Sequence, residues 1–249
     1  MYTKHSKLSL SYPDTQKIWR YINFEKCKSL IEDSALFFCR ADKFKDDKWE
    51  GVLPIKVIEK YMLEAKTLPS DDGDVYSYLK WHKEKEARSH LINCWHVNDK
   101  ESFAMWKIYC QDHHLSIAIQ SSIGRLKKSF DATKERIWVG EVEYIDFREK
   151  EFGNRIFNVN IPNTLKTFLL KWHYFTYEKE IRAILNKAYS KHKEKIGIPV
   201  KIDLSKLVDC IYLSPTAGKE DEKKIRDLLE HNNCSFNIKR SDLGMKLYM

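Results

Sequence analysis

Hydrophobic and polar residues alternate along two stretches in the second half of the chain, residues 137–145 and 176–185. A repeat of two places successive side chains on opposite faces of a strand, so both stretches predict β-strands. Other apolar stretches, each bounded by polar or turn-forming residues, predict further strands. These are Ile18–Ile22, Ala35–Arg40, Leu91–Val97, Leu115–Gln120, Ile198–Ile202, Cys210–Ser214 and Phe236–Arg240.

Apolar residues recur at helical spacing in several segments between these strands. The segments are Phe24–Asp33, Pro54–Lys66, Val75–Ser89, Asn163–Trp172 and Lys219–Asn232. Asn98 and Asp99 offer an N-cap for one more helix that runs through Cys110. Because helices and strands follow one another without a strict β-α-β rhythm, we expect an α+β fold. The expected architecture is a single domain over residues 1–249, with a mixed, curved sheet covered by several helices.

The composition is that of a folded protein with a mild positive charge. Of 249 residues, 43% are hydrophobic, which excludes disorder along most of the chain. Lys and Arg outnumber Asp and Glu by 44 to 36, which gives a formal charge of +8. The basic residues are dispersed among acids, as in residues 83–88. This mixture favours a solvated helix surface over a clustered nucleic-acid footprint, which stays a minority interpretation.

Three features of the sequence predict a cytoplasmic location. No apolar run approaches the ~18 residues of a membrane-spanning helix, so no membrane partner is expected. Residues 1–17 contain no apolar stretch of the kind found in secretory signals. None of the six cysteines forms a C-x-x-C pair, so we expect reduced thiols rather than a disulfide framework.

The segment 177–182 has the most unusual charge pattern. On a strand, Glu178, Glu180 and Arg182 would share one face, and two carboxylates on that face repel each other. Arg182 could compensate for this repulsion, and so could a cationic reaction centre. The sequence therefore leaves two interpretations open, an exposed Glu–Arg ladder or a catalytic pair of carboxylates.

Two other segments are candidates for a functional site. Asp46, Asp47 and Glu50 follow a predicted strand, where acids either bind a metal or cap a turn. Trp106 and Tyr109 lie on one predicted helix, where aromatic residues either pack in the core or form a stacking wall for a planar ring.

Metal, phosphate-loop and hydrolase chemistry receive little support from the spacing of residues. Cys94, His96, His113 and His114 match no standard zinc pattern, so no metal is expected. The sequence contains no glycine-rich phosphate loop, no G-x-S-x-G elbow and no H-E-x-x-H motif.

Together these segments resemble an uncharacterised bacterial family that is known as a domain of unknown function. Four motifs carry the resemblance over roughly residues 17–215, and they are Trp19-Arg20-Tyr21, Phe44-x-Asp46-Asp47-x-x-Glu50, Cys94 with Met105-Trp106-x-x-Tyr109, and Tyr177-Glu178-x-Glu180-x-Arg182. Lys48 stands where the family pattern has proline, and Trp172 lies earlier than the family's usual tryptophan. Family members often lie near phage-defence and toxin genes. The resemblance thus implies a defence or toxin effector, with a cognate antitoxin or defence-system partner.

The order of residue types is also similar to that of ADP-ribosyltransferases. These enzymes place Arg or His on an early strand, an aromatic residue in the middle and a Glu, often as E-x-E, on a late strand. Arg20, Tyr109 and the Glu178/Glu180 pair follow that order, although Phe38-Cys39-Arg40-Ala41 stands where an S-T-S-type strand is usual. The similarity implies NAD as the substrate, with a protein or nucleic acid as acceptor, or NAD cleavage by water.

These observations assign a role to each candidate residue. Glu180 is expected to be the main catalytic carboxylate, Glu178 to activate the acceptor and Arg20 to bind phosphate. The expected cofactor-binding residues are Arg20, Tyr21, Trp106 and Tyr109.

Two other functions remain open. The first is a nucleic-acid-binding protein or a metal-dependent nuclease, with Asp46, Asp47, Glu50, Glu178 and Glu180 around a divalent ion. The second is a non-catalytic interaction module in which the acidic segments are purely structural.

Overall fold

A computed structural model describes residues 1–4, 8, 10–44, 50–51, 77, 85–110, 115–148, 164–188 and 194–244. The helix predicted at Pro54–Lys66 and most of the one at Val75–Ser89 lie outside these residues. So do Asp46, Asp47, His113 and His114. None of the helices in the described ranges combines the length and the apolar character needed to traverse a lipid bilayer.

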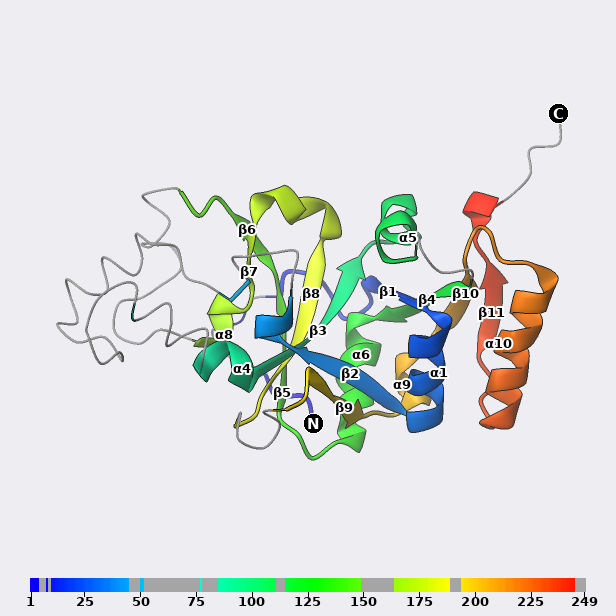
Figure 1. Cartoon of the computed structure of the whole chain (residues 1–249), viewed down its shortest axis with the longest axis horizontal. Helices are drawn as coiled ribbons and strands as arrows, with labels where there is room; N and C mark the ends of the chain where they lie inside the picture. Colours follow the sequence, from blue (N-terminus) through cyan, green and yellow to red (C-terminus); the bar gives the residue numbers. More distant parts are fainter. Residues whose placement is uncertain are drawn as a thin grey trace.

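The α+β class predicted from the sequence is confirmed, with helices packed around a mixed sheet (Figure 1). The strands are β1 (Lys17–Asn23), β2 (Ala35–Arg40), β3 (His90–Val97), β4 (Ser116–Ser122), β5 (Ile137–Glu141), β6 (Glu143–Ile145), β7 (Leu170–Trp172), β8 (Glu180–Asn186), β9 (Gly197–Lys201), β10 (Cys210–Leu213) and β11 (Asn237–Arg240). The α-helices are α1 (Phe24–Asp33), α4 (Ala87–Ser89), α5 (Phe103–Cys110), α6 (Ile123–Ser129), α8 (Thr164–Thr167), α9 (Leu204–Leu207) and α10 (Lys219–His231). Short 3₁₀ turns include η4 (His173–Glu178) and η6 (Asp242–Gly244).

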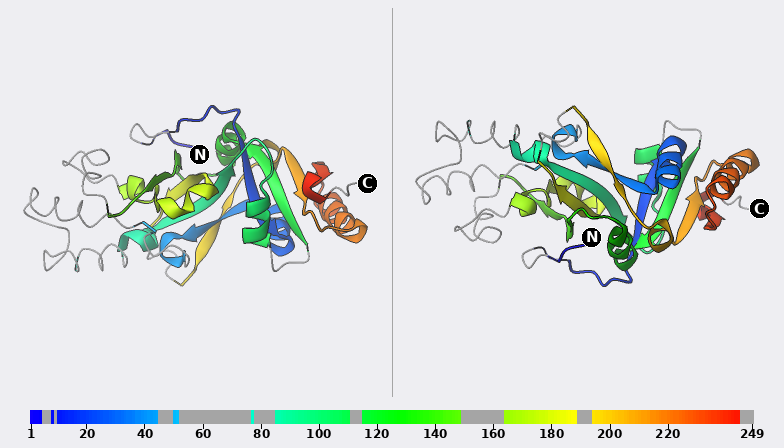
Figure 2. Two further views of the ribbon diagram at one scale, coloured as in Figure 1. Left: turned by 90° about the horizontal axis from the view of Figure 1, so that it is seen from above. Right: turned by 90° about the horizontal axis from the view of Figure 1, so that it is seen from below.

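Strand β3 is the centre of the main sheet and has different partners along its two edges. One edge pairs with β8 over the whole of residues 90–96. The other edge pairs with β2 at residues 91 and 92 and with β1 at residues 96 and 97. The strands β1 and β2 therefore separate from each other between these two contacts, and the sheet twists strongly at this point (Figure 2). The order β11-β10-β4-β1 continues on one side of the separation, and β2-β9 continues on the other.

The two faces of the sheet differ in character. The larger apolar core covers one face and includes Trp95 and Ile181, which oppose each other on β3 and β8. The other face carries two smaller apolar clusters, one around Phe168 and one beneath α5. Glu180 and Arg182 lie on that face, opposite His96 and Cys94 of β3. All six cysteines are free thiols.

Two predicted elements differ from the observed ones. The helix predicted over Asn163–Trp172 ends at Thr167, and β7 begins at Leu170 because this segment pairs with β6. The strand predicted over residues 176–185 begins only at Glu180, since residues 173–178 form η4. Helix α5 begins at Phe103 rather than after Asp99, and helix α6 had no clear signal in the sequence.

The residue that caps the C-terminus of helix α1, Ser34, has a strained backbone conformation. Ser34 has φ +45° and ψ +49°, a left-handed conformation that usually falls to glycine at this position. Its N–H bonds to carbonyl oxygens of the last turn, and its own carbonyl accepts a bond from Ile202 N at 2.9 Å. The chain needs this conformation because β2 begins at the next residue.

We expect Ser34→Gly to raise the free energy of unfolding by about 0.5–1 kcal/mol. Relief of roughly 1–2 kcal/mol of left-handed strain outweighs the ~0.4–1 kcal/mol that the more flexible unfolded chain costs. Chemical denaturation measures the change. Ser34→Ala is the control, because it keeps the Cβ atom and gains nothing. Equal stabilisation by both variants would show that the backbone conformation is not the cause.

Candidate active site

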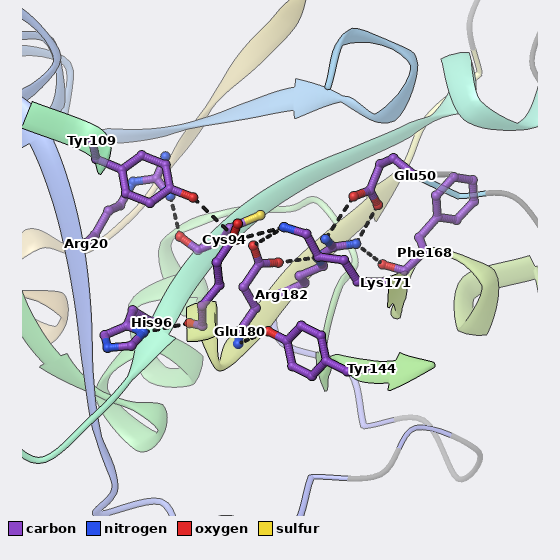
Figure 3. A network of polar contacts seen from close by, with 11 residues as sticks. Arg20, Glu50, Cys94, His96, Tyr109, Tyr144, Phe168, Lys171, Glu180 and Arg182 are labelled. Carbon is purple, nitrogen blue, oxygen red and sulfur yellow. Dashed lines mark hydrogen bonds and ion pairs between the residues drawn. The ribbon is translucent and has the colours of Figure 1, made fainter. Parts of the chain in front are cut away.

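A cluster of charged side chains lies where η4 meets β8 (Figure 3). Glu178 ends η4 and Glu180 begins β8, and Lys179 between them has φ +42° and ψ +59°. The spacing of the two glutamates predicted one continuous strand, but only Glu180 lies on a strand. The left-handed turn at Lys179 nevertheless brings both carboxylates to the same ammonium group.

That ammonium group belongs to Lys171 on β7. Its Nζ lies 2.7 Å from Glu178 Oε2 and 3.0 Å from Glu180 Oε1. All three side chains are more than nine-tenths buried. Sequence reasoning missed Lys171 because it placed this residue in a helix. Strand β7 has only three residues, too few to show the repeat of two that marks a strand in the sequence.

Arg182 links Glu180 to the third carboxylate, Glu50. Arg182 Nε donates to Glu180 Oε2 at 2.7 Å, and its two Nη atoms contact the two oxygens of Glu50 at 2.5 and 2.9 Å. Arg182 Nη1 also donates to the Phe168 carbonyl at 2.8 Å. The guanidinium group is fully buried, so every contact it makes is shielded from water.

Glycine at position 51 allows Glu50 to approach this close. Gly51 has φ +71°, and a Cβ atom at this position would lie 2.5 Å from the Phe168 ring. The same Phe168 supplies the carbonyl that Arg182 binds. A residue with a side chain at position 51 would therefore push the segment away from the cluster.

Among the residues that the structure describes, the cluster has one more carboxylate than it has cations. Glu50, Glu178 and Glu180 face Lys171 and Arg182 in a region from which water is largely excluded. Two cations neutralise two carboxylates, so the third must hold a proton or leave a buried negative charge. Among these three, Glu178 makes no contact with Arg182 and is the surplus group.

The pKa values of the two neighbouring glutamates move in opposite directions. Burial, the shared hydrogen bond with Glu180 and the charge of Glu180 raise the pKa of Glu178 to about 8. Burial also opposes the ionisation of Glu180, but Arg182 and Lys171 lower the pKa of Glu180 below its ordinary value. Burial raises the pKa of Glu50, although Arg182 counteracts it. At neutral pH the proton therefore resides on Glu178.

Three further side chains surround the glutamates. Tyr144 Oη accepts a bond from Glu180 N at 2.8 Å. His96 Nδ1 lies 2.6 Å from the Glu178 carbonyl, so this nitrogen carries the proton and donates. Burial lowers the pKa of His96, which keeps its imidazole neutral. Its Nε2 is buried without a hydrogen-bond partner among the residues that the structure describes.

Tyr109 connects the cluster to the surface. Its hydroxyl lies 3.4 Å from Glu178 Oε2, which is long for a hydrogen bond, while the residue is 46% exposed. Burial of the hydroxyl end and the nearby Glu178 charge raise the pKa of Tyr109, so it stays a neutral phenol. Tyr109 thus has its hydroxyl toward the surplus carboxylate, while almost half of the residue is exposed to solvent.

Arg20 lies in the gap where β1 and β2 separate. Its Nη1 donates to the Cys94 carbonyl at 2.6 Å, and its guanidinium lies 6.0 Å from the centre of the Trp95 ring. Because β3 lies between β1 and β8, the strand of Arg20 does not pair directly with the strand of Glu180. Register places Trp19, not Arg20, on the face of His96 and Glu180. Arg20 therefore reaches the edge of the cluster through the gap (Figure 3).

Tyr21 and Trp106, predicted as cofactor-binding residues, are part of the protein interior. They are 6% and 4% exposed, and their rings pack edge-to-face with centres 4.9 Å apart. The Tyr21 hydroxyl accepts a bond from Ser102 N, and Trp106 Nε1 donates to Glu101. This burial leaves neither ring a free face for a ligand, so core packing accounts for both residues.

The cluster does not resemble a metal centre. The described ranges contain no group of three or more His, Cys, Asp or Glu residues placed to hold a metal ion. Glu50, Glu178 and Glu180 do converge, as the nuclease interpretation predicted, but Lys171 and Arg182 occupy the positions between their oxygens.

Comparison with known proteins gives a distant structural likeness. No protein-family model matches the chain, and no curated protein matches it in sequence. The structure is similar to Thermus sp. 2.9 DarT in complex with ADP-ribosylated ssDNA, with a TM-score of 0.42, 11% identity, and coverage of 95% of this chain and 99% of that one. It is also similar to the same DarT in complex with NAD⁺, with a TM-score of 0.41, 10% identity, and coverage of 95% and 100%. A likeness this distant assigns no function, which has to come from the chemistry of the cluster.

We expect the stability of the protein to fall as the pH rises from about 5 to about 8. Glu178 has a pKa of about 8 in the folded protein and an ordinary value near 4.5 when unfolded. Between these values the folded state binds the extra proton, so raising the pH favours unfolding. Denaturation of the wild type and Glu178→Gln at several pH values measures this. Glutamine has nearly the shape of glutamic acid but does not ionise. In the variant, the free energy of unfolding should therefore lose the part of its pH dependence that Glu178 causes. Parallel curves for the two proteins would contradict the assignment.

Proposed function

We propose that this protein cleaves the bond between nicotinamide and ribose in NAD and transfers the ADP-ribosyl group to an acceptor. The observation that carries the proposal is the surplus carboxylate, Glu178, buried beside the half-exposed ring of Tyr109. A buried group of this kind gains most from a ligand that brings or develops positive charge. NAD⁺ carries a cationic nicotinamide ring, and its cleavage creates positive charge on the ribose.

The reaction breaks one bond and forms one. The bond between ribose C1′ and the nicotinamide nitrogen breaks, and its electron pair neutralises the pyridinium ring, which leaves as nicotinamide. The ribose passes through an oxocarbenium-like state, as in glycoside cleavage. An acceptor oxygen or nitrogen then attacks C1′ and loses its proton. With water as acceptor, the products are ADP-ribose and a proton.

Charges in the cluster favour roles for the two glutamates that differ from those predicted from the sequence. Both oxygens of Glu180 are bonded to cations, so its charge is already neutralised. Glu178 shares only Lys171 and lies next to Tyr109. In the proposed reaction Glu178, once ionised, stabilises the positive ribose, and Glu180 with Arg182 fixes Lys171 and the strand.

Tyr109 and Arg20 are the remaining contacts in this proposal. The Tyr109 ring stacks against the nicotinamide ring after its hydroxyl leaves the 3.4 Å contact with Glu178. Arg20 uses one N–H on the Cys94 carbonyl, and among the described residues its other N–H groups have no acceptor. A guanidinium with free donors suits the pyrophosphate of NAD through paired hydrogen bonds.

The acceptor in this proposal is a nucleophile on a protein or a nucleic acid. Tyr177, 48% exposed, lies near Tyr109 and offers a second ring on which a base could stack. A toxin or defence role, with a cognate antitoxin, is part of the same proposal and follows from the resemblance of the four sequence motifs.

We expect Glu178→Gln to lower NAD turnover about 10²–10³-fold, because the charge lost is the one that meets the ribose. The variant should fold, since glutamine preserves the neutral form that Glu178 has at neutral pH. For the wild type, log kcat/KM should rise with pH and level off near pH 8, where Glu178 ionises. Release of nicotinamide measures both effects.

Two controls separate this outcome from its alternatives. Glu143→Gln alters an exposed glutamate on β6 and should leave turnover unchanged. Full activity of Glu178→Gln would remove that residue from the mechanism. Absence of NAD turnover in the wild type, with nucleic-acid cleavage that a chelator abolishes, would instead support the metal-dependent nuclease.

A further inference from the structure

Helix α5 presents Tyr109 to Glu178 and is held to the sheet on its inner side only. Met105, Trp106 and Cys110 pack onto Trp19 and Tyr21 of β1 in one aromatic cluster. Its outer side, with Phe103 and Ile108, is 50% or more exposed. A helix of eight residues with so little cover depends on contacts at its ends to stay in place.

Glu101 makes the main polar contact at the beginning of α5. Its Oε2 accepts bonds from Trp106 Nε1 at 2.8 Å and from Ser241 Oγ at 2.6 Å. Its Oε1 accepts a bond from Asp242 N at 2.8 Å. One carboxylate therefore connects the first turns of α5 to a segment 140 residues further along the chain.

The segment on the other side of this connection is itself anchored to the sheet. Ser241 follows β11, is 5% exposed, and donates its N–H to the Leu213 carbonyl at the end of β10 at 3.1 Å. Gly244 N in turn bonds to the Ser241 carbonyl. The bonds from Glu101 therefore join the residues just before α5 to the residues just after β11, and Figure 1 shows where these elements lie.

We infer that Glu101 is a positioning residue for the active site. It transmits the fixed position of β10 and the 241–244 segment to α5, and α5 in turn holds Tyr109 over Glu178. The effect on activity rests on the proposed function, whereas the effect on the helix does not. Neither Glu101 nor Ser241 touches Glu178, so both act only through α5.

Ser241→Ala tests the connection without altering α5. Hydrogen exchange of the amides in residues 103–110 should become about tenfold faster, the factor for one lost bond to a charged group. Glu101→Gln should increase exchange further. The glutamine NH₂ group replaces one of the two acceptor oxygens, so at least one of the three donors to Glu101 loses its acceptor. Ser205→Ala is the matched control, since Ser205 Oγ donates to the Asp203 carboxylate at the same 2.6 Å but belongs to α9, which packs against α6.

Kinetics of NAD cleavage supply the second measurement. Ser241→Ala should raise KM for NAD about tenfold with a smaller change in kcat, because Tyr109 contributes a binding surface. In a Tyr109→Ala background the same substitution should have no further effect on KM. Unchanged exchange in α5 would overturn the connection. Faster exchange with an unchanged KM would overturn the positioning role. If the wild type cleaves no NAD, the proposed function fails, and exchange alone decides the structural inference.

Discussion

Lys171 and Arg182 hold three glutamates together in a region that water barely reaches. The positions of β7 and β8 depend on keeping these five side chains in contact. Arg182 must be central on β8 to reach both Glu180 and Glu50. Strand β7 must bring Lys171 to the η4–β8 junction. A buried ion network in which one partner is missing costs roughly 3–5 kcal/mol, so these elements are constrained to assemble together.

The same network explains why the surplus group is useful. A protein that only needed stability would match carboxylates and cations, or replace both with apolar side chains. Here Glu178 shares its one cation, Lys171, with Glu180 and lies next to a half-exposed aromatic ring. The gap between β1 and β2 adds Arg20, whose guanidinium has one bond, to the Cys94 carbonyl, within the described part of the chain. These features together suit a cationic ligand that carries phosphate groups.

Local sequence patterns predicted the elements that depend on local contacts. Helix α1 and strand β2 have the predicted bounds, because apolar residues at helical spacing mark the first and a buried apolar run marks the second. The pattern at 178–182 also singled out three of the residues that meet in the buried cluster, Glu178, Glu180 and Arg182. It did not identify the 3₁₀ turn before Lys179, since that left-handed residue is imposed by tertiary contacts.

Local patterns did not predict the features that depend on contacts between residues far apart in the sequence. Lys171 was missed because three residues are too few to show strand periodicity, and its pairing with β6 decides the conformation. Tyr21 and Trp106 had the residue types of a stacking wall, but their burial depends on how α5 packs on β1. Arg20 lies on the opposite face from Glu180 because its neighbour Trp19 is the residue that pairs with His96, and successive side chains on a strand alternate between faces.

The most direct test of the surplus carboxylate is a titration of the glutamate side-chain carboxyl carbons by NMR. Comparison with Glu178→Gln assigns the resonance of Glu178. The account predicts that the resonance of Glu178 titrates with a midpoint near pH 8. The carboxyl group of Glu180 should stay ionised down to acidic pH. If Glu178 titrates close to the ordinary glutamate value of about 4.3, the proton is absent at neutral pH and the account is contradicted.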